Sequence, residues 1–340
     1  MKLLITTQAV DKNHSNLALM HRWIEEFAKH CEEVYVICLF EGEHTLPANV
    51  HIYSLGKEKG ISRVKYILNF YKYICRLRRV CDAVFVHMNP EYAILGGLLW
   101  RFWNKPIALW YTHKSVNLKL RVATLLANII FSASRESFRL RTNKLHATGH
   151  GIDIEMFAPR VTSAKDLHII TCGRISKTKR LMEMLDVLDV LYMRGIPFHF
   201  SIVGAPIFEY DRKYEKEVQR KIAQRPYANS VHFMGAVLYR DMPKILGSES
   251  VFINLSETGS IDRTVLEAMS IGLIPVTSNE AFREILEPYG LYVKWNEPSM
   301  IADALVHAKD VNSAELSRYV AEHHSLQHLI PLMLDVILTV

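Results

Sequence analysis

The chain has 340 residues, of which 49% are hydrophobic and 22% charged, so it has enough apolar material for two hydrophobic cores. Residues 1–160 hold 22 Lys and Arg against 13 Asp and Glu, whereas residues 161–340 hold 19 against 22. The formal net charge of +6 therefore resides in the first half, which indicates an anionic partner there. The five cysteines are odd in number and form no Cys-x-x-Cys pair, which argues against a disulfide framework or a zinc site.

No apolar run approaches the ~18 residues of a membrane-spanning helix. The opening MKLLITTQAV is too short for a secretory leader and is typical of a first strand. The densest apolar stretch, 93–103, is interrupted by Arg101. We therefore expect a cytoplasmic protein, with contact at the inner face of the cell membrane left open.

Short β-rich runs alternate with helical patterns over the first half of the chain. Strands are expected at 2–7, 33–40, 82–88, 106–113 and 129–134, and helices at 16–31, 64–80, 92–103 and 118–129. Apolar strands that do not alternate in polarity and are separated by helices indicate a parallel, doubly wound sheet. The rhythm breaks at 150–166, which is rich in Gly, Asp, Pro and small polar residues.

The same alternation then restarts. Strands are expected at 167–173, 198–204, 231–235, 250–256 and 273–278, and helices at 180–194, 211–225, 239–247, from 263 and at 281–287. The predicted domains are 1–157 and 165–322. Residues 323–340 form a C-terminal helix that is placed against the first domain, with Pro331 kinking it or shifting its start. The predicted fold class is α/β, with two Rossmann-like halves on either side of a cleft.

A basic loop follows the first strand of the second half, in the sequence CGRISKTKR (172–180). Arg174 and Lys179 stand on the approach to a helix, where a guanidinium fork and an ammonium group suit phosphate oxygens. A solvated basic loop explains the same pattern equally well.

A second pattern is TGSIDRTVLEAMSIGLIPV (258–276), which predicts a tight loop, a helix and a buried strand. Helix openings expose backbone N–H groups and bind anions. Glu267 lies about one turn into this helix. It either complements the helix dipole or accepts hydrogen bonds from the hydroxyl groups of a ribose.

In their order and spacing, GRISKTK, SVHFMG and LSETGSIDRTVLEAMSIGLIPVTS resemble the second domain of family-4 nucleotide-sugar glycosyltransferases of the GT-B fold, the glycosyl transferases group 1. The segment HGIDIEMF (150–157) resembles the one that closes their first domain, although Asn-Gly-Val-Asp is more usual there. The resemblance covers nearly the whole chain and is strongest over 145–290. It implies two facing Rossmann-like domains with an interdomain cleft, and sugar transfer with retained anomeric configuration and no metal ion or other cofactor.

The resemblance also implies roles for individual residues. Arg174 and Lys179 match the pair that grips the donor diphosphate, and Glu267 matches the carboxylate that holds the ribose. Thr264 and Val265 match positions whose backbone N–H groups approach the phosphate. Gly204 matches a glycine near the nucleoside.

One departure from the family pattern concerns the sugar. The family usually has two Glu separated by seven residues, and the position of the first is occupied here by Gly259. Asp262 either replaces the missing carboxylate or caps the helix, and Ser260 with the loop backbone is another candidate for holding the sugar.

His113 ends the expected strand in ALWYTHKS (108–115). It matches a histidine that the family commonly has near the donor sugar or acceptor, and we assign it a catalytic role together with Arg174 and Lys179. An ordinary histidine at a strand end is the alternative.

The segment 56–79 holds eight Lys or Arg and one Glu, interleaved with aromatic residues. It is read as a helix with a solvated basic face, as a contact with anionic membrane, or, least favoured, as a nucleic-acid surface; no nucleic-acid partner is expected.

The expected function is transfer of a hexose, mannose included, from GDP-mannose or a UDP-hexose to a hydroxyl of a glycan or glycolipid acceptor. The enzymatic alternative is a sugar-nucleotide epimerase of the same fold. The non-enzymatic alternative is a basic protein that binds membrane or nucleic acid.

Overall fold

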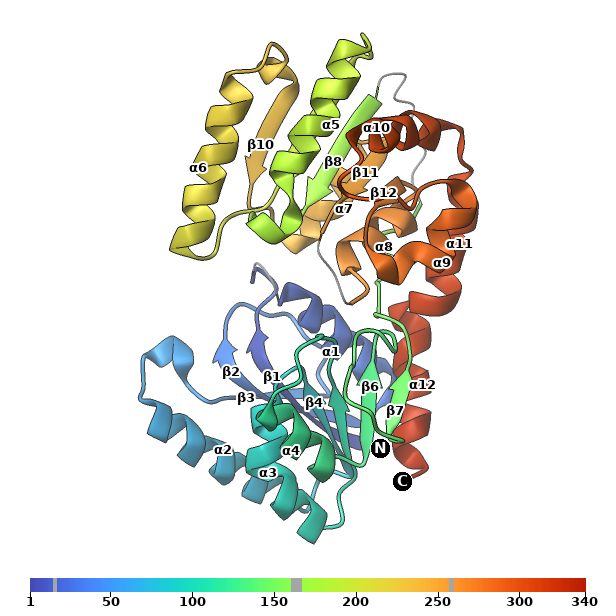
Figure 1. The fold of residues 1–340 in the computed structure, drawn as a ribbon. Helices are drawn as coiled ribbons and strands as arrows, with labels where there is room; N and C mark the ends of the chain where they lie inside the picture. The colour runs from blue at the N-terminus through green and yellow to red at the C-terminus, as the bar shows by residue number, and fades with distance from the viewer. Residues whose placement is uncertain (15–16, 160–166, 257–259) are drawn as a thin grey trace. The chain divides into compact units, whose positions relative to one another are not determined.

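The computed structural model describes residues 1–14, 17–159, 167–256 and 260–340 (Figure 1). It divides the chain into two compact units. The first comprises residues 1–153 and 323–340, and the second comprises residues 154–322. The C-terminal segment thus belongs to the unit that contains the N-terminus.

The first unit ends at Asp153, so the expected boundary at residue 157 lies too far along the chain. Asp153 is held in the first unit by Arg22, whose Nε donates to its Oδ2 at 2.7 Å. Phe157 is fully buried in the second unit, where its carbonyl oxygen accepts a hydrogen bond from Ser270 Oγ at 2.9 Å. The chain therefore changes cores between these two side chains.

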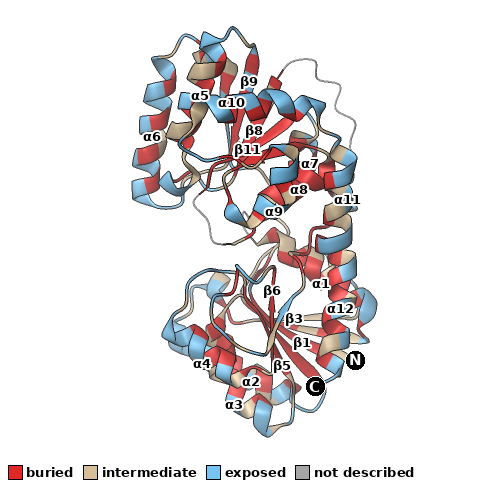
Figure 2. Cartoon of the chain, turned by 45° about the vertical axis from the view of Figure 1, so that its right-hand side comes forward, coloured by how far each residue is buried: buried red, intermediate tan, exposed pale blue. Residues whose placement is uncertain are grey.

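The first unit contains a seven-stranded parallel sheet in the order β3-β2-β1-β4-β5-β6-β7. The central strands are buried on both faces (Figure 2), as parallel sheets covered by helices require. Its strands are β1 (Lys2–Val10), β2 (Glu33–Glu41), β3 (Val50–Ser54), β4 (Ala83–His87), β5 (Ile107–Trp110), β6 (Ile129–Ser132) and β7 (Leu145–Ala147).

Helices cover both faces of this sheet. The helices α2 (Arg63–Leu77), α3 (Pro90–Phe102) and α4 (Leu118–Leu126) share one core with the side chains of Val84 and Val86. The helices α1 (Ala18–His30) and α12 (Leu326–Leu338) pack against each other, and α1 covers the other face, where the ring of Trp23 lies 4.9 Å from that of Trp110. Alternate residues of the strands therefore face different cores.

The C-terminal helix α12 begins with a side-chain cap, because Ser325 Oγ accepts a hydrogen bond from the backbone N–H of His328 at 3.0 Å. Pro331 lies inside the helix, and the helix still begins at Leu326, so the proline does not delay its start. Ile152 pairs with Ser325 in a parallel bridge, which ties this segment to the first unit.

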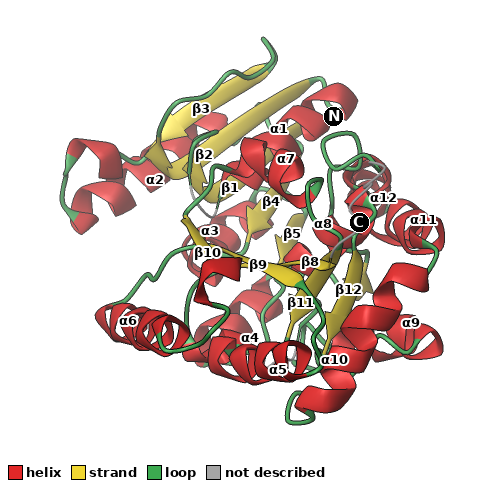
Figure 3. Cartoon of the chain, turned by 90° about the horizontal axis from the view of Figure 1, so that it is seen from above, coloured by secondary structure: helices red, strands yellow, loops and turns green. Residues whose placement is uncertain are grey.

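The second unit contains a five-stranded parallel sheet in the order β10-β9-β8-β11-β12. Its strands are β8 (Leu167–Cys172), β9 (Phe198–Val203), β10 (Val231–Gly235), β11 (Val251–Asn254) and β12 (Ile274–Thr277). The helices α5 (Leu181–Met193), α6 (Glu209–Ala223) and α10 (Pro298–His307) lie on one face, and α7 (Met242–Leu246) and α8 (Arg263–Ile271) lie on the other (Figure 3).

The expected strands and α-helices are confirmed as strands and helices, and the described residues contain two further strands and two further α-helices. The structure adds β3, β7, α10 and α11 (Ser313–His324). The expected helices at 239–247 and 281–287 are short, with α7 and α9 (Arg283–Leu286) flanked by 3-10 turns. Every residue of the edge strand β3 is partly exposed, so no buried apolar run marks it in the sequence.

All five cysteines are free thiols, and Cys31, Cys38, Cys81 and Cys172 are buried. Within the described ranges, the structure contains no helix with both the length and the hydrophobicity needed to cross a bilayer.

Candidate active site

Two glycines bring the ends of β8 and β9 together in the second unit. Gly173 has φ +136° and Gly204 has φ +140°, backbone conformations that residues other than glycine rarely adopt. A Cβ atom added to Gly204 would lie 1.8 Å from the carbonyl oxygen of Gly173. Gly204 is thus required by close backbone packing, which positions the basic loop that follows Gly173.

That basic loop ends in an ion pair. The Nζ of Lys179 lies 2.7 Å from Oδ2 of Asp262, which also accepts a hydrogen bond from Asn254 Nδ2 at 3.0 Å. The other carboxylate oxygen, Oδ1, accepts from the backbone N–H and the hydroxyl of Thr264. Both oxygens of Asp262 are therefore engaged.

Asp262 is the N-cap of α8, so the capping role expected for it is confirmed. Burial alone would raise the pKa of its carboxyl group. The ion pair with Lys179, together with hydrogen bonds from Lys179, Asn254 and Thr264, outweighs burial and holds the pKa well below its usual range. The carboxylate is charged, and it joins the basic loop to the start of α8.

The backbone N–H groups expected to meet a phosphate are already bonded within this cap. The N–H of Thr264 donates to Asp262 Oδ1 at 3.2 Å, and that of Val265 donates to the Asp262 carbonyl at 3.2 Å. A phosphate at this helix start would share these donors with the cap. Gly259 lies outside the described residues, and the carbonyl of Ser260 accepts from Asn279 Nδ2 at 3.1 Å.

Glu267 is almost fully buried in α8. Burial raises the pKa of its carboxyl group, although the positive charge of Arg263 and a hydrogen bond from Tyr239 oppose that shift. Arg263 Nε lies 3.1 Å from Glu267 Oε1, and its guanidinium group lies 5.3 Å from the centre of the Tyr239 ring. The carboxylate thus has an aromatic and a cationic neighbour.

Arg263 and Tyr239 are site residues that the sequence analysis did not identify. Arg263 stands four residues before Glu267, a spacing that places two side chains on the same face of a helix. That spacing is the signal that could have found it. Tyr239 comes from a distant loop and has no such local signal.

Arg174 lies apart from this ion-pair network. Its side chain is 39% exposed, and its Nε lies 3.9 Å from Oδ2 of the buried Asp211 near the start of α6. A cavity of about 440 Å³ lies beside it, lined by Arg174, Ser176, Lys177, Thr178, Tyr210, Asp211, Lys213, Tyr214 and Glu217. Of the described residues, neither Lys179 nor Glu267 lines this cavity, whereas Arg174 and Lys179 together line a much smaller one beside Gly173.

In the first unit, His113 lies in the loop after β5, exposed to solvent. Its Nδ1 accepts a hydrogen bond from the backbone N–H of Ser115 at 3.1 Å. A neutral imidazole that accepts at Nδ1 carries its proton on Nε2. His113 can therefore offer an Nε2–H donor to a hydroxyl group.

His87 is a second strand-end histidine that the sequence analysis passed over. It ends β4, the neighbour of β5, and its Nδ1 lies 3.1 Å from the hydroxyl of the buried Thr7. Met88 follows with φ +60°, a conformation uncommon for a side chain of this size. The position of His87 at a strand end is the same signal that identified His113.

The basic segment forms α2, and its aromatic residues face inward. Phe70 is buried, and Tyr66, Tyr71 and Tyr73 pack against the core. The exposed face of α2 instead presents Val64, Ile67 and Leu68, which are 67%, 43% and 63% exposed. This face combines apolar side chains with Lys65 and Lys72.

The two parallel α/β sheets correspond to the GT-B fold. Residues 166–309 match the model of the family described as Glycosyl transferases group 1. The matched residues all lie in the second unit.

Two curated proteins are similar in sequence. The GDP-mannose:cellobiosyl-diphosphopolyprenol alpha-mannosyltransferase of Xanthomonas campestris is 27% identical over 137 residues, which cover 40% of this chain and 35% of that protein. The putative colanic acid biosynthesis glycosyltransferase WcaL of Escherichia coli is 25% identical over 186 residues, covering 51% and 44%. The chain therefore aligns with less than half of the length of either relative.

Solved structures extend the likeness to the whole fold. HepE from Anabaena, crystallised with UDP, superposes with a TM-score of 0.78 at 15% identity, and the match covers 100% of both chains.

Proposed function

We propose that the protein is a retaining glycosyltransferase that moves a hexose from a nucleoside-diphosphate sugar to a hydroxyl of a glycan or glycolipid. The observation that carries the proposal is the group 1 domain match over residues 166–309, which includes Lys179, Asp262 and Glu267. Lys179 and Asp262 form their ion pair beside the carboxyl ends of β8 and β11, where ligands bind in open α/β sheets, and Glu267 follows in α8.

The proposed roles follow from charge and position. Arg174 and Lys179 stabilise the negative charge that builds on the departing diphosphate, so no metal ion is required. Gly204, Gly259, Ser260, Thr264 and Val265 complete the donor site. Lys179 is already paired with Asp262, so it reaches a phosphate only by sharing or leaving that carboxylate.

Glu267 accepts the ribose hydroxyls in this proposal. Arg263 holds one carboxylate oxygen, and the charged form of Glu267 is the one that accepts hydrogen bonds. His113 places its Nε2–H near the reacting hydroxyl or the donor sugar. The acceptor lies against the first unit.

The donor is GDP-mannose or a UDP-hexose. The first is named for the Xanthomonas relative, and UDP is present in the HepE structure. We further propose that α2, with the rest of residues 56–79, contacts an anionic membrane surface, because its exposed face is both basic and apolar. A cytoplasmic enzyme at the inner face of the membrane fits this contact.

A thermal-shift panel tests the donor site. UDP, GDP, ADP and their common sugar conjugates are added to the wild type and to Glu267→Ala, since a ligand that binds only the folded state raises the melting temperature. One nucleoside diphosphate should stabilise the wild type and lose that effect in the variant. No shift at millimolar nucleotide would count against the transferase.

Analysis of the reaction products distinguishes a glycosyltransferase from the enzymatic alternative, a sugar-nucleotide epimerase. A transferase releases nucleoside diphosphate only when an acceptor is present, whereas an epimerase converts the donor sugar without one.

A further inference from the structure

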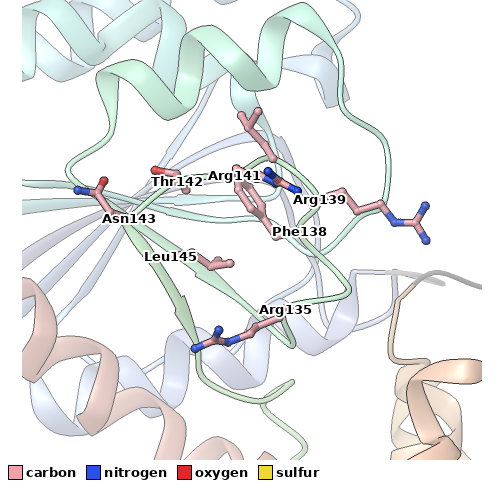
Figure 4. A pocket seen from close by; sticks show the side chains of 8 residues that line it. Arg135, Phe138, Arg139, Arg141, Thr142, Asn143 and Leu145 are labelled. Atoms are coloured by element: carbon pink, nitrogen blue, oxygen red, sulfur yellow. The ribbon is translucent and has the colours of Figure 1, made fainter.

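The connection between β6 and β7 in the first unit departs from the ordinary crossover of a parallel sheet. Parallel strands are usually joined through a helix that covers the sheet. Residues 133–144 contain only turns and bends. The segment leaves a cavity of about 350 Å³, lined by Arg135, Phe138, Arg139, Leu140, Arg141, Thr142, Asn143 and Leu145 (Figure 4).

The floor of this cavity is apolar and belongs to the core of the first unit. Phe138 is buried, and Leu140 and Leu145 pack against the same core. Lys144 fixes the end of the loop, because its Nζ donates to the carbonyls of Thr124, Leu125 and Ala127 beside the end of α4. The end of the loop is therefore tied to the end of α4.

Three arginines extend from the loop on different sides of Phe138 and Leu145. Arg135, Arg139 and Arg141 are exposed, and among the described residues no carboxylate lies within 4.0 Å of their guanidinium nitrogens. No acidic side chain lines the cavity, whereas Thr142 and Asn143 add neutral hydrogen-bonding groups. Unpaired guanidinium groups favour phosphate, to which they donate paired hydrogen bonds.

Phe138, which lines the cavity, is linked to His113 by two successive ring contacts. The ring of Phe138 lies 6.1 Å from that of Tyr111, and Tyr111 lies 6.4 Å from His113. A ligand held in the cavity would thus lie near the loop that carries the proposed catalytic histidine.

We propose that this cavity binds the phosphate or diphosphate group of an amphipathic ligand. Arg135 and Arg141 hold the phosphate oxygens, and the apolar part of the ligand lies on Phe138 and Leu145. The ligand is the glycosyl acceptor, an assignment that rests on the function proposed above. The phosphate belongs either to a soluble ester or to a lipid headgroup.

The test is calorimetric titration of the full-length protein with inorganic pyrophosphate and with farnesyl diphosphate. It is carried out in an Arg174→Ala background, which weakens phosphate binding at the donor site. Arg135→Ala/Arg141→Ala should weaken the binding of both ligands by roughly tenfold or more, the usual effect of losing charge-assisted hydrogen bonds. Farnesyl diphosphate should bind more tightly than pyrophosphate.

The control variant is Lys216→Ala/Arg220→Ala, which removes two exposed charges from α6. An equal loss of affinity in the control, or no loss in the arginine variant, would overturn the site. Sedimentation with vesicles containing phosphatidic acid, in a Val64→Glu/Leu68→Glu background that removes the membrane contact proposed for α2, identifies the source. Loss of vesicle binding in the arginine variant alone indicates a lipid headgroup, whereas loss of farnesyl diphosphate binding without it indicates a soluble ester.

The two proposals can fail separately. The melting temperature of Arg135→Ala/Arg141→Ala and its stabilisation by the nucleotide should match the wild type, because both side chains are exposed and lie in the first unit. Intact nucleotide binding with no phosphate binding in the cavity would reject the cavity alone.

Discussion

Lys179 and Asp262 form an ion pair that joins the loop after β8 to the start of α8, with 2.7 Å between Nζ and Oδ2. The side chains are only 21% and 19% exposed, so solvent screens the pair weakly. One carboxylate thus caps a helix and neutralises a lysine expected to bind phosphate.

Breaking this pair should destabilise the protein in a pH-dependent way. Lys179→Met should lower the free energy of unfolding at pH 7 by about 1–3 kcal/mol, because it leaves Asp262 partly buried without its cation. The folded pKa of Asp262 is lowered, so its stabilising effect is present above the ordinary pKa of 3.8 and is lost as the pH falls. The gap between variant and wild type should therefore begin to shrink below that pH.

Urea unfolding at pH 7 and pH 3 checks this prediction. Lys216→Met, on the exposed face of α6, should change stability by less than about 0.5 kcal/mol. Equal losses in the two variants would show that the ion pair contributes nothing.

The glycine contact between β8 and β9 should tolerate no side chain. Gly204→Ala should cost at least about 3 kcal/mol of unfolding free energy, because its backbone conformation is strained for alanine and its Cβ would overlap the Gly173 carbonyl. Gly195→Ala is the matched control, with φ +68° and open space around the added Cβ. It should cost only about 1–2 kcal/mol. Equal costs would mean that the loops can separate freely.

Acid should destabilise the first unit through His324. Burial, followed by the charges of His150 and His323, lowers the pKa of His324 to about 3. Between pH 3 and the ordinary pKa of 6.5, His324 binds a proton more readily in the unfolded chain than in the folded protein. The contribution of neutral His324 to the free energy of unfolding is therefore full above pH 6.5 and declines as the pH falls. The expected loss between pH 7 and pH 5 is about 2 kcal/mol.

His324→Gln should remove this part of the pH dependence. Unfolding free energies measured at pH 7 and pH 5 provide the check. His328→Gln, at an exposed position of α12, should keep the wild-type slope. An unchanged slope in His324→Gln would assign the acid sensitivity to other groups.

Nucleotide binding should weaken in acid at a higher pH than an ordinary glutamate requires. Burial raises the pKa of Glu267, and only its charged form accepts ribose hydroxyls. The acidic limb, where nucleotide affinity falls as the pH is lowered, should therefore have its midpoint above pH 4.5. Arg263→Gln removes the opposing charge and should move the midpoint higher still.

Calorimetric titration across pH measures that midpoint. Glu267→Gln should bind nucleotide roughly tenfold or more weakly and show no acidic limb. A limb that persists in this variant would place the titrating group elsewhere.

The exposed apolar face of α2 should bind anionic vesicles. Val64→Glu/Leu68→Glu should reduce sedimentation with phosphatidylglycerol vesicles at least tenfold, because it replaces exposed apolar side chains, which would enter the membrane surface, with negative charges that the surface repels. Tyr192→Glu/Met193→Glu adds the same charge at exposed positions of α5 and should have no effect. Equal binding to neutral phosphatidylcholine would contradict an electrostatic contact.

The sequence determined the alternation of strands and helices, because that pattern follows from local periodicity and turn residues. It also predicted the capping position of Asp262 correctly, since the cap bond to Thr264 joins residues close in the chain. The edge strands β3 and β7 were missed, because strands at a sheet edge carry little buried apolar sequence.

Only the tertiary structure decided which charges meet. Lys179 and Asp262 are 83 residues apart in the chain, and Tyr239 reaches Glu267 from another loop. The cavity beside Phe138 exists because a connection without a helix leaves the core uncovered. Such contacts depend on how the strands are ordered in the sheet, and strand order is set by packing between distant segments rather than by any local pattern.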